Sequence, residues 1–225
     1  MIKAVFMDFY GTVTHENGPI AMEVVQKIYK TSSAESPEEV LRYWWTAFRE
    51  KLQDANGEHF QTQHDIALRN FEDLLEHFDS SESPQKLLAR MEEHWCTTAA
   101  YVDAKPFMEA VDCPVYFVTN SDDKYVFAAA EKNKLHPEGI ITSEQARYSK
   151  PRKEIFLYAL EKAGLHPSEV VHIGDSLIGD IEGAEQAGIK SIWLNRNGAS
   201  VPFGVTSANG LDEVLTVLRE MMKRC

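Results

Sequence analysis

The chain begins with a short apolar run that ends at a carboxylate. Ile2 and the segment Ala4–Met7 are apolar, and Asp8 follows them directly. A continuous apolar run of this length predicts a buried strand. Gly11 allows a tight turn after it, and Thr12 adds a hydroxyl. Ligands of open α/β sheets bind beyond the carboxyl ends of the strands, so Asp8 lies where chemistry is expected; an aspartate that only caps a turn is the alternative.

From residue 15 to residue 97 the apolar positions recur at helical spacing. The segments with this spacing are 21–29, 37–52, 65–78 and 83–95. Ser36 and Ser83 each precede a proline, which predicts an N-cap followed by Pro in the first helical turn. We therefore expect four helices that form an inserted bundle. The predicted division is a core of 1–14 with 98–225 and a helical cap of 15–97.

After this region, apolar strands alternate with amphipathic helices. The predicted strands are 114–119, 139–142, 170–173 and 190–194, and the predicted helices are 124–133, 152–163, 177–187 and 211–222. The longest stretch without a regular pattern is 195–209. Strands joined through helices form right-handed crossovers and a parallel sheet, so the predicted fold class is α/β.

Charge and cysteine content narrow the function classes. The formal net charge is −12, which argues against a surface for nucleic acid or anionic membrane, because both require clustered Lys and Arg. Cys96, Cys113 and Cys225 have no CxxC spacing and suggest no disulfide framework. The first residues enter a strand without a basic flank and an apolar signal segment, so we expect a cytoplasmic protein.

The ends of the predicted strands carry the candidate site. In a parallel sheet these ends meet at one edge, so polar residues far apart in the sequence are expected to converge. Each has a structural alternative as a helix cap or a solvated loop side chain. The residues are Asp8 after the first strand, Thr119 and Asn120 after the second, Lys150 after the third, and Asp175, Ser176 and Asp180 after the fourth.

Such a set suits nucleophilic catalysis by a carboxylate. Asp8 would attack and form an ester or acyl phosphate that water then hydrolyses. The carboxylates of Asp8, Asp175 and Asp180 would repel one another and any anionic substrate. Mg²⁺, which takes oxygen ligands and substrate phosphate, would relieve both problems. Lys150 would supply the remaining positive charge, and Thr119 would hold phosphate oxygens that do not react.

Four motifs in the same order resemble those of the haloacid dehalogenase (HAD) superfamily. They are DFYGT (8–12), VTN (118–120), KP with a later IF (150–151 and 155–156), and GDSLIGD (174–180). The resemblance implies a Rossmann-like, three-layer core with an α-helical cap inserted after the first motif. It also implies that Asp8 is the nucleophile, in a motif that ends at Thr12. By the same resemblance, Thr119, Asn120 and Lys150 stabilise the phosphate or the intermediate, and Asp175 and Asp180 lie at the metal.

Tyr10 departs from the pattern of the family's phosphatases, which carry Asp at this position as general acid and base. The DxYGT sequence resembles instead that of the metal-independent 2-haloacid dehalogenases. Those enzymes use a cap arginine for the substrate carboxylate, and a rough alignment places Trp45 there, between Arg42 and Arg49. Trp45 is our candidate substrate-binding residue of the cap.

Electrostatics favours the phosphatase interpretation. Two like charges about 4 Å apart cost on the order of 4 kcal/mol at an effective dielectric of about 20. Three acidic side chains without a metal would oppose a haloacid carboxylate. The Tyr10 backbone carbonyl remains able to bind Mg²⁺, although the family's acid and base is missing.

We therefore predict a Mg²⁺-dependent hydrolase of a small phosphorylated metabolite. It should be slow or selective for good leaving groups, and Tyr10→Asp should speed hydrolysis of poor leaving groups. The alternatives are a 2-haloacid dehalogenase and a weakly active protein that binds a ligand or regulates. The expected partner is an anionic small molecule, with no nucleic acid and no membrane, for a monomer or homodimer.

Overall fold

A six-stranded parallel sheet forms the centre of the protein. The computed structural model describes residues 1–223. The sheet has the order β3-β2-β1-β4-β5-β6, and each neighbouring pair is parallel. All carboxyl ends therefore lie at one edge. The strands are β1 (Ala4–Met7), β2 (Val115–Thr119), β3 (Gly139–Thr142), β4 (Val170–Gly174), β5 (Lys190–Leu194) and β6 (Ser207–Ala208).

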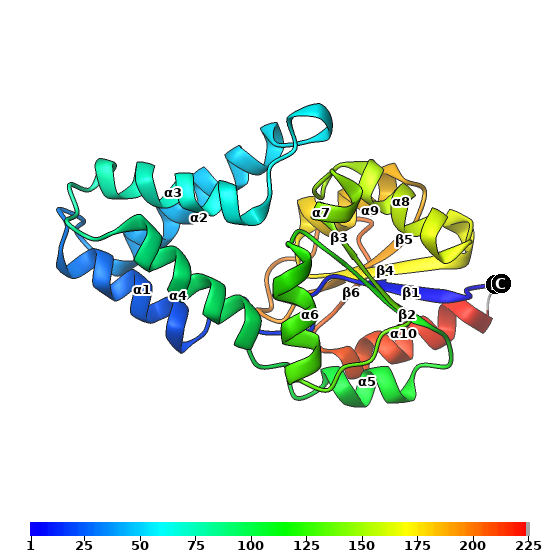
Figure 1. Ribbon diagram of the computed structural model, residues 1–225. Coiled ribbons are helices and arrows are strands. Elements are labelled where there is room, and N and C mark those ends of the chain that lie inside the picture. Colours follow the sequence, from blue (N-terminus) through cyan, green and yellow to red (C-terminus); the bar gives the residue numbers. More distant parts are fainter. Residues whose placement is uncertain (224–225) are drawn as a thin grey trace.

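Helices cover both faces of the sheet, which explains why the strands are apolar throughout. Adjacent strand residues point to opposite faces. Val5 and Met7 pack with α5 (Ala104–Ala110), α6 (Asp123–Lys132) and α10 (Leu211–Lys223), whereas Phe6 packs toward α8 (Lys153–Ala163) and α9 (Gly183–Gln186). Figure 1 shows these two helical layers, with α7 (Ser143–Ala146) beside α8. The predicted α/β, three-layer, Rossmann-like architecture is confirmed.

Four helices between β1 and β2 form a bundle beside the sheet (Figure 1). We call α1 (Pro19–Lys30), α2 (Pro37–Asp54), α3 (Gln63–His77) and α4 (Pro84–Thr97) the helical bundle. They share an apolar core that includes Ile28, Trp44 and Phe71. The Ser36 side chain accepts a hydrogen bond from Glu39 N, as the predicted cap requires. The residue limits of core and cap stay a prediction.

Contacts between helical bundle and core place α3 over the sheet edge. The Asp122 carboxylate accepts hydrogen bonds from Gln63 N (2.7 Å) and His64 N (3.0 Å), so it caps α3 rather than its own helix α6. A short 3₁₀ turn, η1 (Gly57–His59), lies between α2 and α3, and Gly57 N donates to Arg147 O at 2.9 Å. These contacts hold one side of the helical bundle against the core.

The structure differs from the predicted elements in three places. The predicted helix 177–187 is a π-helix, η3 (Leu177–Glu182), followed by the short α9. The sequence pattern missed α5 and α7, and also β6, which lies inside the segment expected to be irregular. A two-residue strand is too short to produce a periodic signal.

Cys96 and Cys113 are free thiols, and Cys225 lies outside the described residues. None of the helices within residues 1–223 is long and apolar enough to cross a bilayer.

Candidate active site

Asp8 follows β1 at the sheet edge and lines a cavity between the core and the helical bundle. Its amide donates to Ile173 O at 2.9 Å, which extends the pairing with β4 and holds the residue rigidly. The residue is 7% exposed, and the cavity that its side chain lines has a volume of about 730 Å³. Gly11 forms the turn with φ +94°, where a Cβ would lie 2.6 Å from an Asp175 carboxylate oxygen, so only glycine fits.

Lys150 bridges two buried carboxylates. Its Nζ lies 2.5 Å from Asp8 Oδ1 and 2.7 Å from Asp180 Oδ1. Asn120 holds the Lys150 backbone on both sides, since its Oδ1 accepts from Lys150 N (2.7 Å) and its Nδ2 donates to Lys150 O (3.0 Å). Burial alone would lower the pKa of Lys150, but Asp180 and Asp8 raise it, so the ammonium stays charged.

Asp180 is the anchor of Lys150 rather than an open carboxylate. Its Oδ1 also meets His172 Nε2 at 2.9 Å, and its Oδ2 accepts from Ser176 N at 3.0 Å. Despite burial, Lys150 and His172 lower the pKa of Asp180, so it stays ionised. A Cβ on Gly174 would lie 2.1 Å from Asp180 Cγ, so the motif's glycine makes room for this side chain.

His172 is a site residue that the sequence interpretation missed. His172 is fully buried on β4, and its Nε2 holds Asp180. Burial lowers the pKa of His172, so the ring is neutral. Its Nδ1 has no hydrogen-bond partner among residues 1–223. His172 lies eight positions before Asp180 and outside the four motifs, so the motifs do not indicate it.

Asp175 lies against the turn of the first motif, where a Cβ on Gly11 would meet its carboxylate. Thr12 Oγ1 donates to Asp175 Oδ1 at 3.1 Å, and Trp193 Nε1 donates to the Asp175 carbonyl at 2.8 Å. Burial, followed by the charges of Asp180 and Glu16, raises the pKa of Asp175 to about 7. Thr12 therefore contacts Asp175 and positions it.

The donor set fits a divalent cation. Asp8, Asp175 and Asp180 each offer an oxygen, and these atoms all lie within 4.8 Å of one another. Hydrogen bonds within residues 1–223 reach Oδ1 of Asp8 and of Asp175 but neither Oδ2. An oxygen-lined pair of this kind matches the preference of Mg²⁺. Burial, Asp180 and Asp175 outweigh Lys150 and raise the pKa of Asp8 to about 8, which a cation at Oδ2 would reverse.

Tyr10 occupies the position of the family's acid and base but points elsewhere. Its hydroxyl donates to Trp95 O of α4 at 3.0 Å, and burial raises its pKa, so it is a poor proton donor to a substrate. Thr119 and Asn120 line the cavity together with Asp8 and Lys150, as their predicted roles require.

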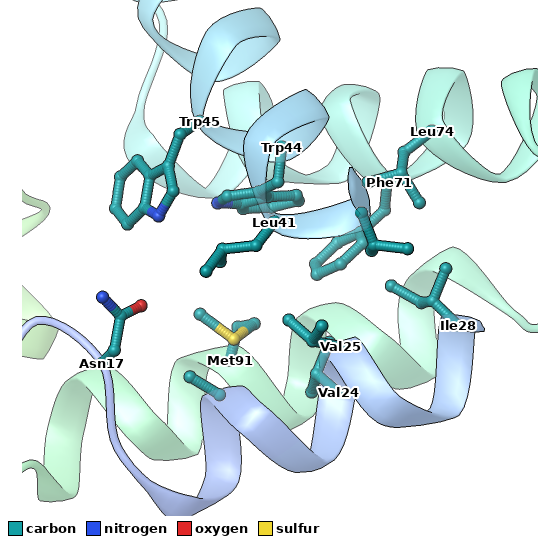
Figure 2. A pocket seen from close by; sticks show the side chains of 12 residues that line it. Asn17, Val24, Val25, Ile28, Leu41, Trp44, Trp45, Phe71, Leu74 and Met91 are labelled. Atoms are coloured by element: carbon teal, nitrogen blue, oxygen red, sulfur yellow. The ribbon is translucent and has the colours of Figure 1, made fainter. Parts of the chain in front are cut away.

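The α2 helix supplies one wall of the cavity. The α2 residues that line it recur at intervals of three or four positions: Glu38, Leu41, Arg42, Trp44, Trp45, Phe48, Arg49, Leu52 and Gln53. Trp45 is half-buried there. Behind this wall, an apolar pocket of about 20 Å³ lies inside the helical bundle, where Trp44, Phe71 and Met91 face one another (Figure 2). Leu41, Trp44, Trp45 and Met91 line both spaces.

Comparison with known proteins assigns the family. The sequence model of the haloacid dehalogenase-like hydrolases matches residues 2–188. The chain belongs to this hydrolase family. Among curated relatives, the pyrimidine 5'-nucleotidase YjjG of Escherichia coli (strain K12) is 36% identical over 88 residues, which are 35% of this chain and 39% of the relative.

A second relative and the solved structures agree with this family. The HAD-hydrolase YfnB of Bacillus subtilis (strain 168) is 28% identical over 159 residues, 67% of this chain and 63% of YfnB. The matched segments thus span less than two thirds of the length of both relatives. The structure of a dehalogenase with an intermediate complex superposes with TM-score 0.80 at 19% identity, covering 96% of both chains, and shows the shared fold.

Proposed function

We propose that this hydrolase cleaves a small phosphorylated metabolite in a Mg²⁺-dependent reaction with Asp8 as nucleophile. The observation that carries the proposal is the charge balance at Asp8. Oxygens of three carboxylates lie within 4.8 Å of one another, and within the described residues 1–223 the one ammonium that contacts them, Lys150, bridges Asp8 and Asp180. A divalent cation offsets the remaining negative charge and allows a dianionic phosphate to approach.

Asp8 performs the chemistry in two steps. An Asp8 carboxylate oxygen forms a bond to phosphorus while the bond from phosphorus to the leaving oxygen breaks. Water then attacks phosphorus and releases inorganic phosphate and free Asp8. Lys150 and Thr119 hold oxygens of the transferring group in our proposal, and Asn120 keeps Lys150 in place through its backbone.

The metal would be held by Asp8, Asp175 and the Tyr10 backbone carbonyl. When bound, Mg²⁺ neutralises charge on the phosphoryl oxygens. In this proposal Asp180 is not a metal ligand, although the sequence predicts it as one. Because both its oxygens already accept hydrogen bonds, Asp180 supports the site by holding Lys150.

The leaving group would extend along the α2 wall. Trp45 offers an aromatic surface, and Arg42 and Arg49 offer positive charge, in a cavity that also contains Glu38. This mixture suits a polar or anionic metabolite with a flat portion. Two relatives have names that support phosphoester hydrolysis, a pyrimidine 5'-nucleotidase and an N-acylneuraminate-9-phosphatase, and YfnB was crystallised with magnesium.

A 2-haloacid dehalogenase is the second candidate. Several solved structures with this fold are L-2-haloacid dehalogenases, and Arg42 and Arg49 could receive a substrate carboxylate. The Asp175 carboxylate, which Thr12 aims at the cavity, opposes this reaction because it repels an anionic substrate when no cation is present.

Metal removal tests the choice between these activities. We expect hydrolysis of acetyl phosphate and p-nitrophenyl phosphate with Mg²⁺, loss of both activities in EDTA, and recovery when Mg²⁺ is returned in excess. Phosphate and p-nitrophenolate release provide the readouts. Chloride release from 2-chloropropionate in EDTA, without phosphate release in Mg²⁺, would establish the dehalogenase instead. Phosphate binding without turnover of any of these compounds would indicate a binding protein.

A further inference from the structure

Proton transfer to the leaving group has no obvious donor on the first motif. The Tyr10 hydroxyl is engaged with Trp95 O at 3.0 Å, and burial raises the Tyr10 pKa. Lys150 holds its protons between two carboxylates. An alkoxide leaving group in water would need a proton from another side chain of the cavity.

Glu16 is the acidic side chain that the mechanism has not used. It lies in the segment between β1 and α1, where the chain passes from the core to the helical bundle. Its side chain is half-buried and lines the cavity together with Asp8, Asp175 and Lys150. It therefore faces the space in which the phosphoester would lie.

The backbone around Glu16 is held from two sides. His94 Nε2 of α4 donates to Glu16 O at 2.8 Å. The neighbouring residue His15 donates its amide to Ala99 O at 3.0 Å, and its carbonyl accepts from Thr98 Oγ1 at 2.6 Å. The two chain segments that join the core to the helical bundle, near residues 15–16 and 98–99, therefore pair with each other and fix the position of Glu16.

The surroundings of Glu16 bring its pKa close to neutral pH. Burial and then the charge of Asp8 raise its pKa to about 7, while Arg49 of α2 lowers it. A general acid works best with a pKa near the working pH. The charged or titratable groups that share the cavity or contact the segment are Asp8, Asp175, Asp180 and Lys150 of the core, Glu38, Arg42 and Arg49 of α2, and His94 of α4.

We propose that Glu16 is the general acid and base of this hydrolase. It takes the role of the aspartate that the family's phosphatases carry where this chain has Tyr10. The inference rests on the proposed phosphoester hydrolysis. As the bond between phosphorus and the leaving oxygen breaks, the Glu16 carboxyl gives its proton to that oxygen. In the second step the Glu16 carboxylate takes a proton from the attacking water, the bond between phosphorus and Asp8 breaks, and the acid is regenerated.

Leaving groups of different basicity test the proposal. With Glu16→Gln, kcat/KM for an alkyl phosphate such as β-glycerophosphate is expected to fall about 10²-fold or more, the usual contribution of a general acid. With p-nitrophenyl phosphate, kcat/KM should change less than about 3-fold, because p-nitrophenolate leaves without a proton. Its kcat should fall, with a burst of p-nitrophenolate equal to the enzyme concentration, because hydrolysis of the phosphoenzyme also loses its base.

Two further variants complete the test. Glu50→Gln removes an exposed carboxylate of α2 that does not line the cavity, and it is expected to change kcat/KM for both substrates by less than about 3-fold. Adding Tyr10→Asp to Glu16→Gln is expected to restore part of the alkyl phosphate activity, whereas Tyr10→Asp alone should add little. The expectation from sequence is the opposite, since there Tyr10→Asp alone speeds hydrolysis of poor leaving groups.

The outcomes separate this inference from the proposed function. If wild-type protein hydrolyses both substrates and Glu16→Gln lowers kcat/KM for both equally, or no more than Glu50→Gln does, the role of Glu16 is overturned and the hydrolase remains. Wild-type turnover of p-nitrophenyl phosphate alone would also overturn it. If wild-type protein turns over neither substrate with Mg²⁺, the proposed function itself fails.

Discussion

Asp8→Asn is expected to lower kcat for p-nitrophenyl phosphate by about 10⁴-fold or more, the scale of loss when a covalent nucleophile is removed. The amide keeps the size of Asp8 but cannot form the phosphoenzyme. Initial rates at saturating Mg²⁺ measure the effect, and a product burst should disappear with it.

The loss should not come from unfolding. Burial and the neighbouring carboxylates raise the pKa of Asp8 above its unfolded value, so its negative charge weakens the fold as pH rises through the range from 3.8 to about 8. At pH 7 in metal-free buffer, Asp8→Asn is therefore expected to unfold at a urea concentration no lower than wild type. Asp112→Asn, an exposed position before β2, serves as the matched control and should keep full activity. Retained turnover in Asp8→Asn would refute the nucleophile assignment.

Lys150→Met is expected to reduce both stability and activity. Removing one partner of a buried ion pair costs about 3–5 kcal/mol, because the remaining charges lose their counterion. Here two carboxylates, Asp8 and Asp180, lose the same ammonium. Urea unfolding followed by circular dichroism gives the free energy of unfolding, and phosphate release gives the activity.

Lys153→Met provides the comparison for Lys150→Met. Lys153 is exposed at the start of α8, three residues along the chain, and its substitution should change the free energy of unfolding by less than about 0.5 kcal/mol. A Lys150→Met protein as stable as this control would show that the carboxylates do not depend on Lys150 for their charge balance.

Local patterns were sufficient for most of the elements. The apolar run before Asp8 predicted β1, and the spacing in 15–97 predicted four helices that the structure contains. The predicted helix 152–163 matches α8, which ends at Gly164 with φ +67°. The π-helix η3 was missed, because its sequence has the apolar spacing of an ordinary helix, and its wider turn is seen in the hydrogen bond from Ile181 N to Ser176 O.

The candidate site was predicted only as a set of strand ends. Parallel pairing brings strand ends to one edge, so Asp8, Lys150 and Asp175 could be expected near one another. Which oxygen meets which donor could not be predicted. Sequence placed Asp180 at the metal, which stays a prediction, and no pattern indicated that its oxygens also accept hydrogen bonds from Lys150, His172 and Ser176. Asp122 directly precedes α6, but its carboxylate caps α3 of the helical bundle.

The sequence alone determined the fold class, the inserted helices and the motif order, because burial of apolar side chains acts through short-range periodicity. The tertiary structure decided the partners of each charge. Asp8 and Lys150 are 142 positions apart, and their contact depends on the closure of the whole sheet. Glu16 belongs to no motif. Its side chain lines the same cavity as Asp8 because His94 of α4 and Thr98 hold the backbone of residues 15 and 16.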